Sequence, residues 1–400
     1  MLSFAVLLAA AAAADTAAPR APAQDAPAVT VHHQPALPVV ALRLSLLADD
    51  PPGYAGAGHL FQHLLLPSLE EQAARVGGRV QAIRSADALV YSVLGPASEL
   101  PYLAALLRSA LRAPAPGGAE LLAALGQLAE ERAARRETAP EYVRAALGAR
   151  LFPAELPAAG TDAGAARLES APLAALWAAL YDPARVSVVA VGDVELEAVQ
   201  RAFRDLPPAP EPAAAVGALA DTLPSLAGDT PQATRGWIGV AYPAPDADPA
   251  ALSVTARLLQ AGLRRRMTRS QVDVEHWWTH RGQALALVVA TPDSLAATAR
   301  RTVGGALEWL DANLDAEGVR VAAAGVRREM LFFSRTPERM AELLGEFADR
   351  GGEPDAAQRY YDALEGVTAA DVRRVLELLA AQEPAQVFVP AQRIPAATRR

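Results

Sequence analysis

The sequence has 400 residues, of which 52% are hydrophobic and 20% are charged. This length exceeds one ordinary core and the composition is that of a globular protein, so we predict two domains. The formal net charge of -8 disfavours nucleic acid as a partner, because phosphate binding needs a basic face, and the absence of Cys excludes disulfides and thiolate metal ligands.

The N-terminus contains an apolar run at residues 4–14, followed by a segment rich in Ala and Pro. The run is too short to span a bilayer, but it has the length of a signal-peptide core with small residues for cleavage at its end. We therefore predict a signal peptide at 1–14, a linker at 15–28 and export to the periplasm. If the run is not a signal, we expect a cytoplasmic protein. No later run is long enough for a membrane helix, so we expect no integral membrane segment after signal removal.

The first half of the remaining chain alternates between strand-like and helix-like patterns. The alternating and β-branched stretches predict strands at 29–31, 38–47, 80–83, 88–94 and 186–191. The helical patterns, with Pro67 ending the first of them, predict helices at 58–66, 69–76, 98–112, 117–137, 140–151, 173–181 and 196–206.

A segment rich in Pro, Ala and Gly at 207–231 is typical of a linker, and the order of elements then recurs. Strands are predicted at 237–241, 272–278, 284–290 and 387–389, and helices at 249–268, 295–312, 318–333, 337–350 and 371–380. This repetition predicts an α+β protein of two homologous domains, 29–206 and 232–392. We expect each domain to be an antiparallel-rich sheet with helices on one face, and the two to form a clam-like pair of halves.

The most informative stretch is the predicted helix that carries His59 and His63. Residues four apart on a helix share a face, so the two imidazoles can converge on one metal ion, and zinc binds such pairs readily. In the inverted zinc motif His-x-x-Glu-His, the Glu takes a proton from the metal-bound water. In this chain Gln62 stands at the position of that Glu.

The pattern Gly56-x-Gly58-His59-x-x-Gln62-His63 resembles the motif helix of the insulinase/pitrilysin family of zinc metallopeptidases, especially bacterial members similar to mitochondrial processing peptidase. Further matches follow in the family's order: Leu69-Glu70-Glu71, Gly77-Gly78, Gln81-Ala82, Ser85, Asp87, Tyr91, Leu151-Phe152-Pro153, Tyr181-x-Pro183 and Val191-Gly192-Asp193. The likeness covers residues 29–206 in detail and the second half in its layout.

The resemblance implies a third zinc ligand, a Glu on a later helix. Glu131 is the best match and Glu130 is the alternative. Both can instead belong to a solvated helix face beside neighbouring arginines. Zinc is thus the cofactor that the resemblance implies, and two histidines left over from a lost metal site are the alternative.

Two departures from the family predict impaired catalysis. Gln62 has no basic lone pair to accept a proton, and a general base contributes roughly 10²–10⁴-fold to rate. Active members also place an Arg and a Tyr in the second half, where the stretch 264–278 offers Arg but no Tyr. We therefore predict a non-catalytic homologue that partners an active homologous peptidase subunit and helps to bind peptide.

Two alternatives remain open from the sequence. The chain can be an active zinc metalloendopeptidase that uses Glu130, Glu131 or a substrate group as its base. It can also be a stand-alone peptide-binding or scaffold protein. A second histidine pair, His276 and His280, lies on a predicted strand, where residues four apart are about 13 Å from each other and cannot share a metal ion.

Overall fold

The computed structural model describes residues 27–85, 87–152, 160–210, 231 and 233–392. The predicted signal peptide and most of both predicted linkers lie outside these residues. Within them, no helix combines the length and the apolar character that a membrane crossing requires.

The N-terminal half, described between residues 27 and 210, is built on a five-stranded sheet with the order β1-β5-β2-β4-β3. Its strands are β1 (Ala28–His33), β2 (Val39–Leu47), β3 (Arg79–Arg84), β4 (Ala88–Pro96) and β5 (Val186–Gly192). β1 pairs in parallel with β5 and the other pairs are antiparallel, so the sheet is mixed. β1 and β3 are the two edge strands of this sheet.

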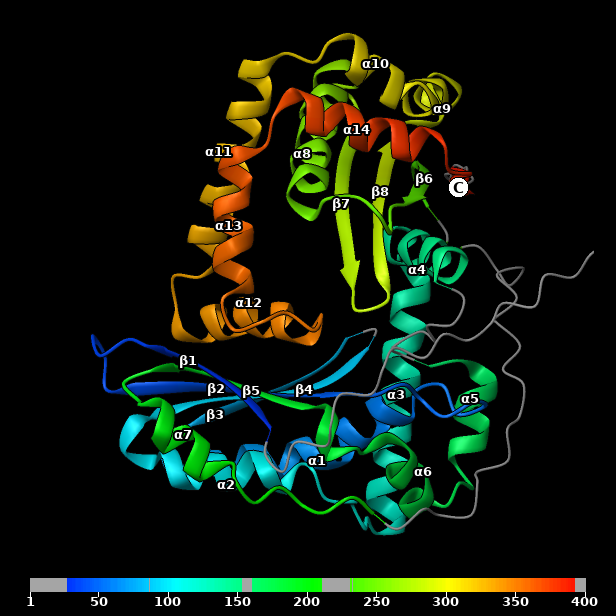
Figure 1. The fold of residues 1–400 in the computed structure, drawn as a ribbon. Coiled ribbons are helices and arrows are strands. Elements are labelled where there is room, and N and C mark those ends of the chain that lie inside the picture. The colour runs from blue at the N-terminus through cyan, green and yellow to red at the C-terminus, as the bar shows by residue number, and fades with distance from the viewer. Residues whose placement is uncertain (1–26, 86, 153–159, 211–230, 232, 393–400) are drawn as a thin grey trace, which may run out of the picture.

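Helices cover one face of this sheet (Figure 1), where apolar residues of β2 such as Leu42 and Leu44 join a core with residues of α1 and α2. The helices of this half are α1 (Ala57–Ala74), α2 (Leu100–Ser109), α3 (Gly118–Glu137), α4 (Ala139–Leu151), α5 (Asp162–Leu168), α6 (Leu173–Leu180) and α7 (Leu196–Ala202), with short 3-10 turns at Ala97–Glu99 and Pro183–Arg185.

The C-terminal half, described from residue 231 to 392 except for residue 232, repeats the plan with a four-stranded antiparallel sheet of order β7-β8-β6-β9. Its strands are β6 (Gly236–Pro243), β7 (Gln271–Thr279), β8 (Gly282–Thr291) and β9 (Ala385–Val389). Its helices are α8 (Pro249–Arg266), α9 (Ala296–Gly304), α10 (Ala306–Ala312), α11 (Ala316–Phe333), α12 (Pro337–Asp349), α13 (Ala356–Gly366) and α14 (Ala369–Ala380), with a 3-10 turn at Asp293–Leu295.

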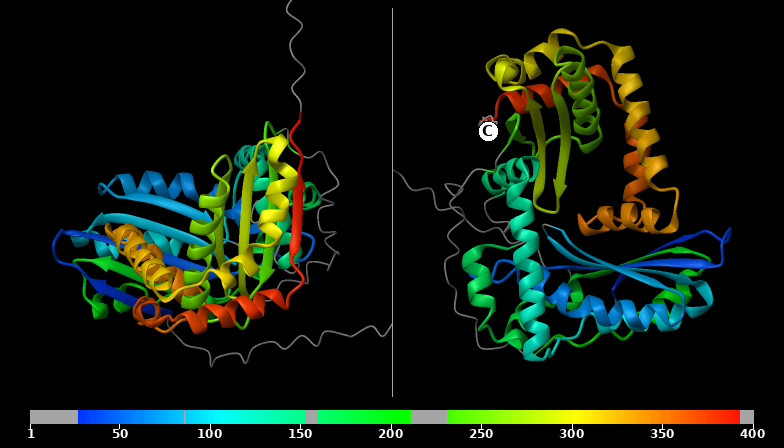
Figure 2. Two further views of the ribbon diagram at one scale, coloured as in Figure 1. Left: turned by 90° about the horizontal axis from the view of Figure 1, so that it is seen from above. Right: turned by 180° about the vertical axis from the view of Figure 1, so that it is seen from behind.

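The second face of each sheet is covered as well, by one helix from the other half (Figures 1 and 2). α12 packs Ala341 against Ala41 and Val191 of the N-terminal sheet, and α4 packs Val143 and Leu147 against the C-terminal sheet. The prediction of helices on one face only was therefore incomplete. Both faces of each sheet are apolar, and a face that is apolar must be buried against another element.

A buried ion pair reinforces the first of these contacts. Arg43 of β2 donates to Asp349 of α12 at 2.6 Å, and both side chains are almost fully enclosed. Gly345 makes room for this pair, because a Cβ at that position would collide with the Arg43 side chain. The two halves thus share a polar contact as well as apolar ones.

Two local predictions were wrong. Pro67 does not end the first helix, since α1 runs on to Ala74 with Pro67 inside it. A proline removes one helical hydrogen bond, and here the burial of Leu69 and Ala73 beyond it outweighs that loss. The helix predicted at 295–312 is two helices that break at Gly304 and Gly305, where glycine favours irregular backbone. The helices α5 and α13 were not predicted.

Candidate metal centre

The two histidines of the motif lie on the first two turns of α1, which packs against β3 and β4. Their rings stack with centroids 4.6 Å apart, as expected for residues one helical turn apart. His59 is only 8% exposed. The rings therefore present their nitrogen atoms together from one helix face.

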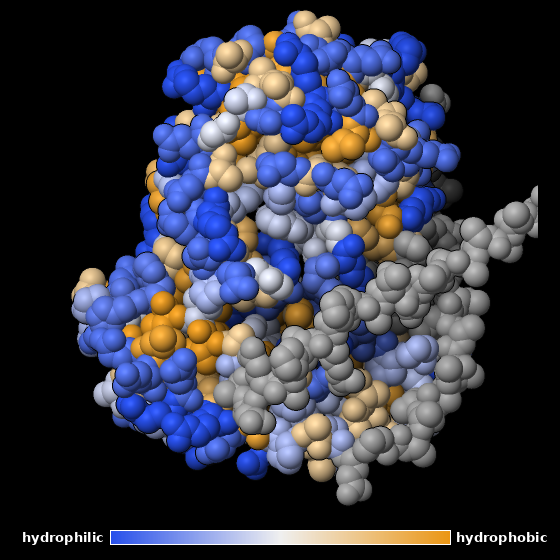
Figure 3. Space-filling model, viewed as in Figure 1, coloured by the Kyte–Doolittle hydropathy of each residue, from blue (hydrophilic) through white to orange (hydrophobic). Residues whose placement is uncertain are grey.

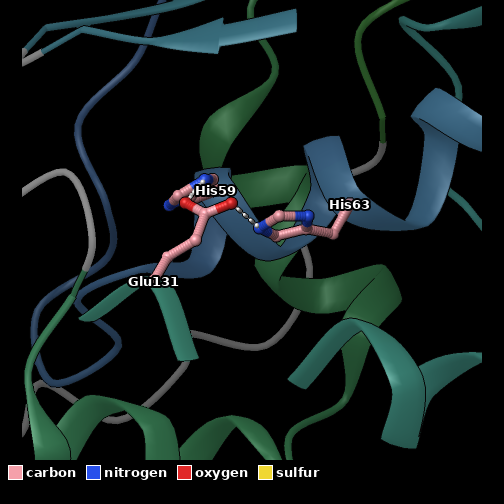
Figure 4. Close-up of side chains that lie close together, drawn as sticks. All are labelled: His59, His63 and Glu131. Carbon is pink, nitrogen blue, oxygen red and sulfur yellow. Dashed lines mark ion pairs between the residues drawn. The ribbon is translucent and has the colours of Figure 1, made fainter. Parts of the chain in front are cut away.

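Glu131 of α3 reaches this face from the opposite side, and its carboxylate lies between the two imidazoles (Figure 4). Its oxygen atoms lie 3.2 Å from Nε2 of His59 and 3.5 Å from Nε2 of His63. In the described part of the chain, these three residues form the one group of His, Asp or Glu side chains that could hold a metal ion, with ligand atoms within 4.8 Å of one another. Glu130, the alternative, is exposed and outside this group.

The donor set fits zinc. Two imidazole nitrogens and one carboxylate are a common set of protein ligands for catalytic zinc, which keeps a fourth position for water. Nε2 of His63 and Nδ1 of His59 are buried, and neither has a hydrogen-bond partner within the described residues. Burial and, to a smaller extent, the neighbouring His63 lower the pKa of His59 to about 4, although Glu131 acts in the opposite direction. The imidazole is therefore neutral at physiological pH, as a metal ligand must be.

Gln62 lies on the same helix but points into the protein. Its side chain is almost fully buried, and Nε2 donates to the backbone carbonyls of Ile83 in β3 at 2.8 Å and of Val90 in β4 at 3.3 Å. The amide thereby ties α1 to the two strands at the sheet edge. A carboxylate could not replace it without placing its negative charge against these two oxygen atoms.

Comparisons of the fold show what the whole chain is similar to. The peptidase M16 inactive domain of Pseudomonas fluorescens matches with a TM-score of 0.75 at 15% identity, over 92% of this chain and 96% of that one. A protease of Helicobacter pylori matches with a TM-score of 0.73 at 16% identity, over 90% of this chain and 96% of that one. The chain has the M16 peptidase fold.

A third match with the M16-like fold lies within a large assembly. A chain of complex III2 of Candida albicans, in a structure with Inz-5 bound, gives a TM-score of 0.71 at 11% identity, over 90% of this chain and 93% of that one. No family model and no curated protein matches the sequence.

A cavity of about 500 Å³ lies between the two halves of this M16-like fold. Its walls include residues of the edge strand β3, of α12 and of the end of β7: Arg79, Gln81, Ile83, Glu338, Glu342, Glu346 and Trp278. On the face shown in Figure 3, the surface is hollowed between the halves and hydrophilic side chains surround the hollow. Ile83 lines the cavity and also accepts the hydrogen bond from Gln62, so the cavity borders the strand to which the motif helix is bound.

The sequence analysis missed two residues that hold the motif helix in place, Asp50 and Arg84. Oδ2 of Asp50 accepts from Gly56 N at 2.7 Å and Oδ1 from Gly58 N at 2.9 Å. Arg84 lies beside it at 3.6 Å, and both side chains are at most 3% exposed. An acidic residue shortly before a glycine-rich helix start is a detectable signal, but its Arg partner arises only from the tertiary fold.

The remaining polar residues singled out in the sequence have separate surroundings. His276 stacks on Trp278 and hydrogen bonds through its two nitrogens to Ser253 and Gln283, whereas His280 contacts Asp87. These two histidines do not share a site. Tyr91 is fully buried, which raises the pKa of its hydroxyl far above its ordinary value.

Proposed function

We propose that this chain is a catalytically impaired M16-type protein that binds peptide without cutting it, as a subunit beside an active homologous zinc peptidase. The observation that carries the proposal is the position of Gln62, which stands where the motif has its general base. Its amide nitrogen is engaged by two backbone carbonyls, and an amide cannot take a proton from water at neutral pH. The similarity to a domain described as inactive supports this conclusion.

Zinc binding is part of the proposal. His59, His63 and Glu131 would hold the ion, and a bound zinc would polarise a water molecule and lower its pKa to about 7. Peptide hydrolysis at such a centre needs both the metal ion and a general base, and the base is missing here. In an impaired subunit the ion would chiefly stabilise the contact between α1 and α3.

Peptide binding is supported by the cavity between the halves. The two halves would act as a clam-like pair, with an extended peptide beside the edge strand β3, whose outward backbone groups can pair with another strand. The role as a subunit draws support from the match to a chain of complex III2. Export to the periplasm completes the proposal, and cell fractionation with an antibody to the chain would test it.

The decisive experiment measures metal content, peptide binding and peptide cleavage on one purified sample. We expect about one zinc per chain, binding of unstructured peptides and no cleavage, with zinc lost in His63→Ala. Co-purification from the source cells should recover a homologue with an intact His-x-x-Glu-His motif. Cleavage by the unmodified chain would favour the active peptidase, and peptide binding by a monomer without zinc would favour the stand-alone scaffold.

A further inference from the structure

The hairpin that joins β7 to β8 in the C-terminal half reaches the N-terminal half with its two-residue tip. Both the backbone N–H and Nδ1 of His280 lie near Oδ2 of Asp87, at 3.0 Å and 2.7 Å. Arg281 forms an ion pair with Asp49 at 2.5 Å. The tip therefore binds two acidic residues that lie on different segments of the other half.

These two segments are the ones that hold the start of α1. Asp49 directly precedes Asp50, which accepts the backbone N–H groups of Gly56 and Gly58. Asp87 lies in the turn after β3, whose last residue is Arg84, and Arg84 donates to the carbonyl of Ala48 at 2.9 Å. The inner pair of Asp50 and Arg84 thus bridges the same two segments that the hairpin tip binds from outside.

The start of α1 depends on these contacts because it has no cap of its own. Gly56 stands at the N-cap with a φ of 97°, and glycine has no side chain to accept from the first turn. Asp50 supplies the missing acceptor from a distance. His59 follows one residue after Gly58, so a shift of this turn moves the ligand atoms.

The pKa of Asp87 reflects its hydrogen bonds to His280. Burial alone would raise the pKa of this carboxyl, but hydrogen bonds from the side chain and backbone of His280 outweigh burial and bring the pKa well below its ordinary value. The ionised carboxylate is thus bound by the hairpin as well as by the hydroxyl of Ser85 in its own turn.

We propose that the tip of the β7–β8 hairpin, residues 280–281, positions the first turn of α1 and through it the candidate ligand His59. His280 and Arg281 are positioning residues, because neither lies in the ligand cluster. The arrangement couples the docking of the C-terminal half to the geometry of the cluster in the N-terminal half. Its metal readout rests on the proposed zinc site, but its backbone readout does not.

The test compares the full-length protein with the double variant His280→Ala/Arg281→Ala. Hydrogen exchange of the metal-free proteins is the first readout, and we expect about 10-fold faster exchange at residues 56–63 in the variant. The second readout is zinc affinity, measured by competition with a chromophoric chelator. Mutation of residues that orient metal ligands typically lowers metal affinity about 10–100-fold, and we expect a loss of about 10-fold here. The third is the visible spectrum after Co²⁺ is bound, which should change because the ligand geometry changes.

The matched control is Arg144→Ala. It removes another ion pair between the halves, from α4 to Glu275 of β7 at 2.6 Å, without touching the segments that hold α1. We expect it to leave exchange at 56–63, zinc affinity and the Co²⁺ spectrum unchanged. Arg281→Lys keeps the charge opposite Asp49 and should behave like the unmodified chain, whereas Arg281→Ala should show part of the effect.

Each outcome decides the proposal. Unchanged exchange at 56–63 in the double variant would overturn it, as would an equal effect from Arg144→Ala, since that would show only a general loosening between the halves. If the double variant does not fold, the single variant Arg281→Ala decides by the same criteria. If the double variant exchanges faster but neither it nor the unmodified chain binds zinc, the positioning role is supported and the proposed metal site is contradicted.

Discussion

The helices α1 and α8 occupy the same place in the two halves, and they differ in how they are used. Each has 18 residues, follows an inner strand of its sheet and precedes a pair of strands. The third and seventh residues of α1 are His59 and His63, whereas those of α8 are Ala251 and Thr255, where the hydroxyl of Thr255 donates to the carbonyl of Ala251. The same positions of the two helices therefore carry a polar cluster in the N-terminal half and buried core residues in the C-terminal half.

The N-termini of the two helices are also capped differently. α8 has a local cap, since Asp248 at the N-cap accepts from Ala251 N at 2.8 Å. α1 has Gly56 at its N-cap and relies on Asp50, which is itself held by Arg84. The helix with the histidines is thus positioned by tertiary contacts, and its counterpart by its own sequence.

The largest expected effect comes from removing these two caps in parallel. Asp50→Ala leaves the buried Arg84 without its counter-charge and should lower the free energy of unfolding by roughly 3–5 kcal/mol. Asp248→Ala removes only a helix cap and should cost about 1 kcal/mol. Urea unfolding of both variants measures the difference, and equal losses would show that α1 does not depend on its remote cap.

Gln62 offers a second way to sharpen the comparison, because its counterpart at the sixth position of α8 is the buried Val254. Gln62→Glu places a carboxylate against the carbonyls of Ile83 and Val90 and should destabilise the protein by roughly 1–3 kcal/mol at pH 8. Gln62→Met keeps the size without the charge and should cost about 1 kcal/mol.

Thermal and urea unfolding at pH 8 measure both Gln62 variants. We also expect no peptide cleavage from Gln62→Glu, since the new carboxylate is directed into the sheet edge. Full stability together with cleavage would show that the side chain at this position is free to turn toward His59, His63 and Glu131.

A smaller effect concerns acid stability in the C-terminal half. Burial lowers the pKa of His276 to about 4, below its value of about 6.5 in the unfolded chain. Between these values the unfolded chain binds more protons, so stability should fall as the pH drops from about 6.5 to 4. From pH 8 to pH 5 we expect this residue to account for about 1–2 kcal/mol.

The comparison of His276→Gln with the unmodified chain checks this effect. The variant should lose less stability than the unmodified chain between pH 8 and pH 5, measured as the shift of the urea midpoint. Identical shifts would show that His276 already takes up a proton in the folded state.

Much of the architecture could be predicted because it rests on local patterns. The periodicity of apolar residues placed the strands and most helices, and their repetition indicated two sheets within an α+β chain. The spacing of His59 and His63 predicted that they share a helix face, which the structure shows. The choice between Glu130 and Glu131 stayed open, because it depends on how α3 is rotated against α1.

What could not be predicted depends on contacts between distant residues. His280 and Asp87 are 193 positions apart, and nothing near either residue indicates the other. The packing of α4 and α12 on the sheet of the opposite half also depends on contacts between distant residues. Pro67 shows the opposite limit, since a local rule for ending a helix was outweighed by the packing of the residues that follow it.

Peptide hydrolysis by the unmodified, homogeneous chain loaded with one zinc ion tests the central claim most directly. Because Gln62 is held at the sheet edge, we expect no hydrolysis above a chelated control. Steady cleavage that is abolished by chelator and by His63→Ala would contradict it, because it would show that the centre works without the missing base.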